Sequence, residues 1–599
     1  MLNQNPKAPQ PVKPIFEDFP VFTAEDLPAY LNLKNSQYSA ADVKALQVHD
    51  PEGVFHILKR GQRLVNRQVI ITGRPADIDQ VIARVHPSVG MSWSLGGQLG
   101  QVKLQNFVGM IKPRCPAGMH GLLDAYADLE IRLVDLVNDE SEAAVWDAIG
   151  AIYDAAEAEK VIVHADPNLT VANPTDGSGN VLGGNVPGML QVANNTGNKT
   201  VAEVYQNHWA FNSGINLEDV VGERQVQQKG KGARVYILDA ISQDVIKHGG
   251  ATSAPQGQNV NRVNKQQVTF ARRKERHNSN DFTEEISIKC YNVPRAVMLG
   301  TLPTALSTSH PVDVHGLYVT ALLKRVAPAA TFNIFNVLNE YGSGEIFSLI
   351  CTLFQVIDDA LGQQSPYEFP LVNTVINMSL EASITEENMI RCGIRGKLRK
   401  LLSSAGNTAS PVMLTLLQEM ISGFHYVPSL HIPVQIAHRL GAALVASSGN
   451  ESAEVFGRMP TAIPARFDEV LDVGASNFWG GMSSYSNQAN ILAPGGGKED
   501  PEDPDADLAG LAASLPNVTP LAMISWGKMN PPGDPEGMLF WWGTSFAAPL
   551  ASGLAALIVG AIPGKLTPGR VKDLIAANVN PATRVINVRK TLDYLNSLP

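Results

Sequence analysis

Cysteine is scarce in this chain of 599 residues, which contains only Cys115, Cys290, Cys351 and Cys392. They are widely spaced and form no C-x-x-C pair, which argues against a disulfide framework and favours reduced structural thiols. An excess of positive charge is also missing. The net charge of −10 argues against a general nucleic-acid binder.

Long apolar runs are rare as well. The segment from Met1 to Phe22 carries several prolines and charges but no apolar core of the secretory type, and no later stretch of about 18 apolar residues stands out. The sequence therefore predicts no signal peptide and no membrane partner, and we expect a cytoplasmic protein. A removed leader stays open, and the oligomeric state is not indicated.

The composition fits a large globular protein. Of its residues, 44% are hydrophobic and 17% are charged. A chain of this length predicts a sizeable core and two or more domains.

A short motif places a serine at the start of an apolar helix, Gly543-Thr544-Ser545-Phe546-Ala547-Ala548-Pro549. The run from Leu550 to Gly560 predicts a buried helix, whose dipole and free N–H groups would favour negative charge beside Ser545. The motif resembles the serine signature of the subtilisin-like serine endopeptidases (subtilases, peptidase family S8). The resemblance implies an acid, a base and an oxyanion donor elsewhere in the chain.

The acid is predicted at Asp239, which ends the apolar run from Ala233 to Leu238. This run resembles the first catalytic strand of subtilases, although Ala240 and Ile241 replace the family's usual Thr-Gly or Ser-Gly. An aspartate that ends a strand is, taken alone, more often a turn or cap residue. The presence of the Ser545 motif in the same chain favours the catalytic interpretation of Asp239.

The base is predicted at His315, because the segment from Val314 to Ala321 resembles the start of the family's histidine helix, with Leu317 in place of the usual Thr. The segment from Thr331 to Leu338 resembles the strand that follows. His310 is the alternative imidazole. It precedes Pro311, which favours an extended loop.

The oxyanion donor is predicted at Asn450, which follows the apolar strand and serines that lead to Gly449. A Gly-Asn pair is usually only a turn. Because the Ser545 motif follows later in the chain, the resemblance to subtilases implies that the Asn450 amide and the Ser545 backbone N–H donate to the tetrahedral oxyanion. No cofactor is required for this chemistry.

Two further segments resemble the walls of the primary specificity pocket of subtilases, and their residues are Ser379, Leu380, Ser447, Ser448 and Gly449. Glu381 stands where the family usually has glycine. It indicates either a preference for a basic residue before the scissile bond or a solvated loop carboxylate, and the second is the more common situation. Extended peptides would bind at such strand edges.

The resemblance extends from about Trp209 to the C-terminus, where short apolar strands alternate with helices. This pattern predicts an α/β fold, a subtilisin-like doubly wound parallel sheet flanked by helices. We expect residues 1–65 to be an unassigned extension, residues 66–171 a smaller α+β domain, residues 172–205 a linker and residues 206–599 the catalytic domain.

The α+β domain is predicted from a strand at Val69, a helix from Asp77 to Val85, a strand from Glu130 to Leu136, an amphipathic helix from Glu142 to Glu159 and a strand from Val161. Its Asp166-Pro167-Asn168 end resembles the end of subtilase propeptides. The linker is then a candidate for self-cleavage. The alternative is a docking domain that is never removed.

Three insertions are expected in the catalytic domain. Residues 256–280 are polar and basic and predict a surface loop, residues 385–440 predict extra helices, and residues 498–510 are acidic. The acidic run suggests structural calcium, although a solvated loop is more common. Extra elements beside the specificity walls would restrict the protein or peptide substrates.

The sequence thus predicts a regulated or self-processed serine endopeptidase. The alternative from another class is a catalytically silent scaffold that binds peptides or partners, suggested by the unusual neighbours of Asp239 and His315. An esterase or peptide ligase with the same groups is a third option.

Overall fold

The computed structural model describes 18 stretches of the chain, and every statement below concerns these residues. They are residues 64–85, 93–137, 142–172, 190–191, 209–217, 229–240, 264–271, 285–292, 315–338, 343–362, 366–382, 394–404, 410–422, 427–450, 452, 458–496, 523–526 and 538–597.

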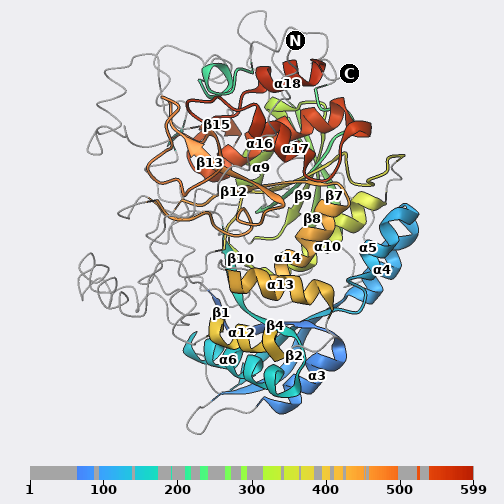
Figure 1. The fold of residues 1–599 in the computed structure, drawn as a ribbon. Coiled ribbons are helices and arrows are strands. Elements are labelled where there is room, and N and C mark those ends of the chain that lie inside the picture. Colours follow the sequence, from blue (N-terminus) through green and yellow to red (C-terminus); the bar gives the residue numbers. More distant parts are fainter. Residues whose placement is uncertain are drawn as a thin grey trace, which may run out of the picture.

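The N-terminal domain is an antiparallel sheet with helices, drawn in blue and cyan in Figure 1. Its elements are β1 (Leu64–Gly73), α3 (Pro75–Arg84), β2 (Ser94–Lys103), α4 (Leu104–Ile111), α5 (His120–Asp124), β3 (Glu130–Val137), α6 (Glu142–Glu159) and β4 (Val163–Ala172). Helix α6 packs on β1 and β4 through its apolar face, as predicted. The sequence analysis did not predict β2, α4 or α5.

The second domain holds the residues predicted for catalysis, and it is called the catalytic domain below. It contains a sheet of eight strands in the order β14-β13-β12-β11-β6-β9-β8-β7. The strands are β6 (Arg234–Asp239), β7 (Asn264–Ala271), β8 (Glu285–Asn292), β9 (Thr331–Asn336), β11 (Thr374–Met378), β12 (Ala443–Ser447), β13 (Val470–Ser476) and β14 (Ile491–Pro494). All neighbours run parallel except β7 and β8, which pair antiparallel. The predicted parallel sheet is confirmed.

The second half of the chain contains eight helices of at least eight residues among the described residues. They are α9 (His315–Val326), α10 (Ile346–Leu361), α12 (Ile394–Ser404), α13 (Pro411–Ser422), α14 (Pro428–Arg439), α16 (Thr544–Ala561), α17 (Arg570–Ala577) and α18 (Val588–Ser597). Those around α9 and α16 and around α10 and α14 cover the two faces of this sheet, whereas α12 and α13 pack on the N-terminal domain. Strand β6 shows the two faces, because Val235 and Ile237 join the core around α9 and α16, whereas Tyr236 and Leu238 join the core around α10 and α14. Short helical turns lie at Lys112–Arg114, Ala117–Met119, Ala210–Gly214 and Pro563–Lys565.

The prediction of a surface loop over residues 256–280 is wrong for β7. Val268 and Phe270 alternate with polar residues and pair with Ile288 and Ile286 of β8, so that this segment forms the edge strand of the sheet. The rest of that insertion, and the helix suggested around Ala40 to Leu46, lie outside the described residues.

Helix α16 is the buried helix predicted after Ser545, although the sequence analysis noted no apolar stretch of this length. By its length of 18 residues and its apolar composition alone, this helix could cross a membrane. The helix is 89% buried inside the protein, where it packs on α9 and on strands β11 to β14. It is therefore the central core helix of the catalytic domain.

The two domains share one hydrophobic core and one sheet. Strand β10 (Ser343–Glu345) of the catalytic domain pairs antiparallel with Thr170–Ala172 at the end of β4. The core around α10 and α14 continues into the N-terminal sheet without a break. A separate three-stranded sheet joins β15 (Met523–Trp526), β16 (Met538–Trp541) and the linker strand β5 (Leu190–Gln191).

Candidate active site

The residues predicted for catalysis gather at one edge of the parallel sheet. Asp239 is the last residue of β6, Ser379 follows β11 directly, and Asn450 lies three residues after β12. The carboxyl ends of parallel strands share one edge, and side chains that follow neighbouring strands are therefore brought together. Strand β6 has β9 on one side and β11 on the other, so the chain changes direction across the sheet at this point.

Asp239 and His315 form a buried pair. Asp239 Oδ1 lies 2.7 Å from His315 Nδ1 and also accepts a hydrogen bond from the Ala240 backbone N–H at 2.7 Å. Both side chains are buried, with exposed fractions of at most 1%. A carboxylate at this distance requires a proton on Nδ1, which leaves Nε2 as the basic nitrogen of the neutral imidazole. The unusual Ala240 therefore does not prevent the contact.

Gly316 allows this pair to form. Its backbone N–H donates to the Ala240 carbonyl at 2.9 Å, which fixes the start of α9 against the turn after Asp239. A Cβ on residue 316 would lie 2.6 Å from the Ala240 oxygen and 3.2 Å from Asp239 Cβ. Only glycine fits between the helix and the turn.

Ser545 is the second residue of α16. Gly543 precedes the helix with a φ of 150°, a conformation that favours glycine. Ser545 Oγ donates to the Ser379 carbonyl at 3.2 Å, and the exposed fraction of the residue is 3%. The nucleophile candidate thus points toward the end of β11 and sits where the helix dipole favours negative charge.

The orientation of the Asn450 amide follows from its contacts with Thr544. Asn450 Oδ1 accepts from the Thr544 backbone N–H at 3.0 Å and from the Thr544 hydroxyl at 2.9 Å. Because a backbone N–H can only donate, this atom must be the oxygen. Asn450 Nδ2 is buried and has no hydrogen-bond partner among the described residues. Asn450 is thus bonded to the residue that precedes the nucleophile candidate. A buried donor without a partner at this place fits an oxyanion that forms only during the reaction.

A buried network that the sequence analysis did not single out links the end of β11 to α16. Ser552 Oγ donates to Asn377 Oδ1 at 2.8 Å, Asn377 Nδ2 donates to Ser379 Oγ at 3.0 Å, and Ser379 Oγ donates to the Ser545 carbonyl at 2.8 Å. In the sequence, this network is indicated only by Asn377, a polar residue between the apolar residues Ile376 and Met378. The network holds the first turn of α16 against β11.

The proposed pocket walls contact each other. The Ser447 hydroxyl lies 3.3 Å from the Leu380 carbonyl. The Ser448 backbone N–H donates to Val473 at 3.0 Å, and Gly449, with a φ of 105°, accepts from the Asn487 N–H at 2.9 Å. The two segments are therefore brought together as expected.

Glu381 is not a solvated loop carboxylate. Its exposed fraction is only 5%. Residue 382 forms an antiparallel bridge with Ile463, and this bridge draws the segment after β11 into the protein. The favoured sequence interpretation of Glu381 is therefore wrong.

Phe546 connects the two halves of the site. Its ring centroid lies 5.2 Å from that of His315 and 4.8 Å from that of Tyr318, both on α9. Helix α9 packs along α16, so the Asp239–His315 pair and the Ser545 group belong to adjacent helix starts. His310 lies outside the described residues.

The surroundings of the site include a buried tyrosine. Burial raises the pKa of the Tyr485 hydroxyl, which donates to the carbonyls of Gly495 and Gly496 at 3.1 and 2.7 Å. Among the described residues, no group of three or more His, Cys, Asp or Glu side chains could hold a metal ion. The acidic run at 498–510 lies outside these residues, so calcium there remains a prediction.

Comparison with protein families identifies one part of this chain. Residues 323–592 match the model of the subtilase family. This part of the chain is a subtilase domain. It contains Asn450 and Ser545, and the family match of this part supports a serine endopeptidase, which is a hydrolase. Asp239 and His315 precede the matched residues.

Solved structures similar to this chain include several proteases. The nisin leader peptidase NisP from Lactococcus lactis is 17% identical, with 65% of this chain and 94% of that chain covered and a TM-score of 0.39. A lanthipeptide protease is 16% identical, with 66% and 96% covered and a TM-score of 0.38. These low scores add no argument to the family match. No curated protein matches this chain.

Proposed function

We propose that Ser545, His315 and Asp239 are the catalytic triad of this endopeptidase. The observation that carries the proposal is the buried Asp239–His315 contact of 2.7 Å at the sheet edge where Ser545 begins its helix. Ser545 Oγ attacks the peptide carbonyl, and His315 Nε2 takes its proton and passes it to the leaving amine. Asp239 holds the imidazole tautomer and stabilises the imidazolium. Water then releases the acyl group by the same route.

Ser545 must change its hydrogen bond during this reaction. Its hydroxyl donates to the Ser379 carbonyl, and rotation about its Cα–Cβ bond directs it to His315 instead. The oxyanion then receives hydrogen bonds from Asn450 Nδ2 and the Ser545 backbone N–H. Asn377 and Ser379 are positioning residues, because they hold the backbone of Ser545.

The N-terminal domain is proposed to act as an inhibitor until the linker is cut. Thr170–Ala172 adds a strand to β10, the kind of edge that extended peptides use. The same strand supplies Asn168, whose Oδ1 accepts from the backbone N–H of Phe347 at 3.1 Å near the start of α10. The chain thus leads from this strand into the linker, where self-cleavage would occur.

A restricted specificity is part of the same proposal. Buried Glu381 beside Leu380 supports a preference for a basic residue before the scissile bond, because a buried carboxylate attracts a cation more strongly than a solvated one. Peptides that differ only in Arg, Gln or Leu at this position test the preference. Glu381→Gln should remove any advantage of Arg.

A fluorophosphonate probe tests the triad. We expect labelling at Ser545 in the wild type, and loss of labelling in Ser545→Ala and His315→Ala. His120→Ala, in the N-terminal domain, is the matched control for a histidine replacement. Full-length masses of the wild type and Ser545→Ala, followed over time, test self-cleavage.

Failure of the probe has two possible meanings that the same sample separates. If Ser545 stays unlabelled after the linker is cut, the triad proposal is wrong and the chain is a silent binding scaffold. If cutting restores labelling, the N-terminal domain is the inhibitor.

A further inference from the structure

Helices α12 and α13 of the insertion contact the N-terminal domain. Helix α12 packs against α6 and α13, and α13 packs against β4. Figure 1 shows both helices, in yellow, beside the blue and cyan elements. The sequence analysis expected this insertion to restrict access beside the specificity walls. Its helices α12 and α13 instead cover the N-terminal domain.

The contact has an extensive apolar part. Leu398 and Leu401 of α12 and Leu416 and Met420 of α13 are buried in the same core as Ile149 of α6. Gly150 of α6 faces Lys397 of α12, and a Cβ at residue 150 would make an ordinary contact of 3.7 Å with Lys397 Cε. Burial of this kind is the main favourable contribution to association.

Polar contacts fix the position of these helices. Lys397 Nζ forms an ion pair with the carboxylate of Asp154 on α6. His164 Nε2, on β4, lies 3.1 Å from the Met413 carbonyl of α13, and the His164 side chain is fully buried. A buried imidazole N–H that donates to a carbonyl orients α13 on the strand.

The N-terminal domain also rests on α10 and α14. Phe107 and Phe354 form an edge contact with centroids 4.6 Å apart. The Tyr126 hydroxyl donates to Gln435 Oε1 at 3.1 Å. Arg114 donates to the Asp358 carbonyl at 3.1 Å and also pairs with its carboxylate. The N-terminal domain is thus held by α10 and α14 as well as by α12 and α13.

Only a small part of the N-terminal domain pairs with the strand edge next to the site. The ladder between β4 and β10 includes just Thr170, Val171 and Ala172. These residues form the end of the domain that continues into the linker. Their departure from β10 would leave the contacts of Asp154, His164 and Tyr126 in place.

We propose that residues 394–422 are a clamp that retains the N-terminal domain after the linker is cut. The partner that fits this surface is residues 64–172 of the same chain, as a separate fragment. The working protease is then a two-fragment complex, in which the end of β4 leaves the strand edge and the rest of the domain stays bound. The clamp acts whichever protease cuts the linker.

The test uses full-length protein with Ser545→Ala and the recognition sequence of a site-specific protease placed between residues 173 and 189. After complete cutting, native mass spectrometry and gel filtration at low micromolar concentration report whether the fragments remain together. We expect a one-to-one complex. Separation of the fragments would overturn the proposal. The result does not depend on catalysis, so it stands apart from the triad and inhibitor proposals.

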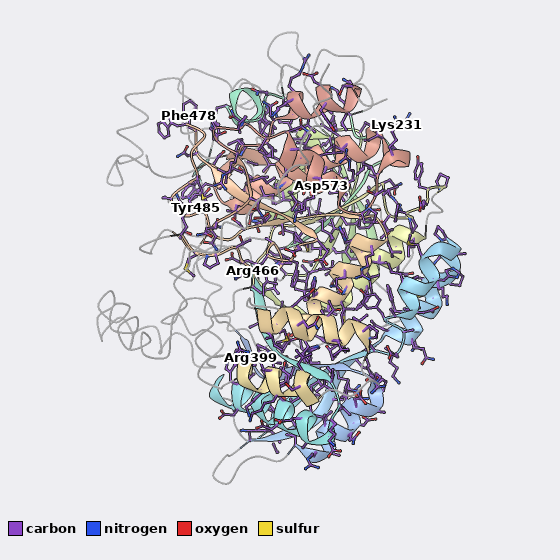
Figure 2. All side chains as sticks on the ribbon, viewed as in Figure 1. Lys231, Arg399, Arg466, Phe478, Tyr485 and Asp573 are labelled. Atoms are coloured by element: carbon purple, nitrogen blue, oxygen red, sulfur yellow. The ribbon has the colours of Figure 1, made fainter. Side chains whose placement is uncertain are left out.

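A charge exchange locates the clamp. Lys397→Glu should speed dissociation of the cut complex about fivefold, and adding Asp154→Lys should restore the original rate. Arg399→Glu is the matched control, because Arg399 is on α12 but is exposed (Figure 2). Retention that is equally insensitive to Lys397→Glu and Arg399→Glu would assign the binding to α10 and α14 and remove the role of the clamp. Leu398→Asp should release the fragment altogether.

Discussion

Asp166 Oδ2 accepts two hydrogen bonds from Ser429, one from its backbone N–H at 3.1 Å and one from its hydroxyl at 2.8 Å. Ser429 lies in the first turn of α14, so a carboxyl group of the N-terminal domain satisfies a free N–H at the start of a catalytic-domain helix. The amide oxygen of Asn168 likewise accepts a hydrogen bond from the backbone N–H of Phe347, near the start of α10. One short segment of β4 therefore supports two helices of the other domain.

The Asp166 contact predicts a pH dependence. Burial raises the pKa of this carboxyl from 3.8 to about 7, against the opposing effect of the Ser429 hydrogen bonds. The folded protein therefore holds the proton more tightly than the unfolded chain. The contribution of the protonated Asp166 carboxyl to the free energy of unfolding is therefore fully present below pH 3.8 and is lost as the pH rises through 7. Asp166→Asn should flatten this fall.

Chemical denaturation of Ser545→Ala protein with and without Asp166→Asn, between pH 5 and pH 8, measures the difference. The free energy of unfolding of the parent should decline relative to the variant over this range. A difference that stays constant with pH would show that Asp166 does not titrate there.

His431 predicts a second pH dependence at higher pH. Burial lowers the pKa of this imidazole, but Glu419 and Glu469, whose carboxylates lie 3.1 and 2.8 Å away, raise it overall to about 9. The stabilisation is fully present below the unfolded value of about 6.5 and is lost as the pH rises through 9. The stability advantage of the wild type over His431→Gln should therefore shrink between pH 7 and pH 10. An advantage that grows with pH would contradict this assignment.

Asn450→Ala should lower kcat by about 10² to 10³ with little change in KM, because the lost donor stabilises the transition state and not the bound substrate. Kinetics with a peptide ester substrate measure both values. Asn450→Asp is the matched variant, since it keeps the shape but replaces the donor by an oxygen. If either variant raises KM while kcat stays the same, Asn450 binds substrate and is not the oxyanion donor.

Gly316→Ala should separate His315 from Asp239, because the new Cβ would lie 2.6 Å from the Ala240 carbonyl. We expect a destabilisation of about 1–3 kcal/mol and slower labelling of Ser545 by the probe. Gly109→Ala, in α4, is the control, since a Cβ there has nothing within 4 Å. It should leave labelling unchanged and stabilise the protein by up to about 1 kcal/mol. Equal effects of the two replacements would contradict the packing argument.

Local patterns explain which features could be predicted from the sequence. Asp239, Asn450 and Ser545 each adjoin an apolar strand or helix, so the placement of these side chains at one sheet edge follows from the order of the elements. The β7 strand was missed because Asn264, Lys265, Gln266 and Gln267 hide the alternation of Val268 and Phe270.

Long-range contacts could not be predicted in this way. Asp166 and Ser429 are 263 positions apart, and Ser379 and Ser545 are 166 apart. Neither pair has a local pattern that identifies its partner, because the contacts depend on how finished elements pack. The same holds for α12, because the sequence predicted extra helices in residues 385–440 but not that one of them meets α6.

Helix α16 joins the nucleophile candidate to the most protected part of the fold. Because the helix is the core of the domain, its backbone amides should exchange with solvent only when the whole domain unfolds. Ser545 then cannot fray away from its neighbours as a residue on a surface loop does. Inactivation by heat or denaturant should therefore coincide with loss of the fold.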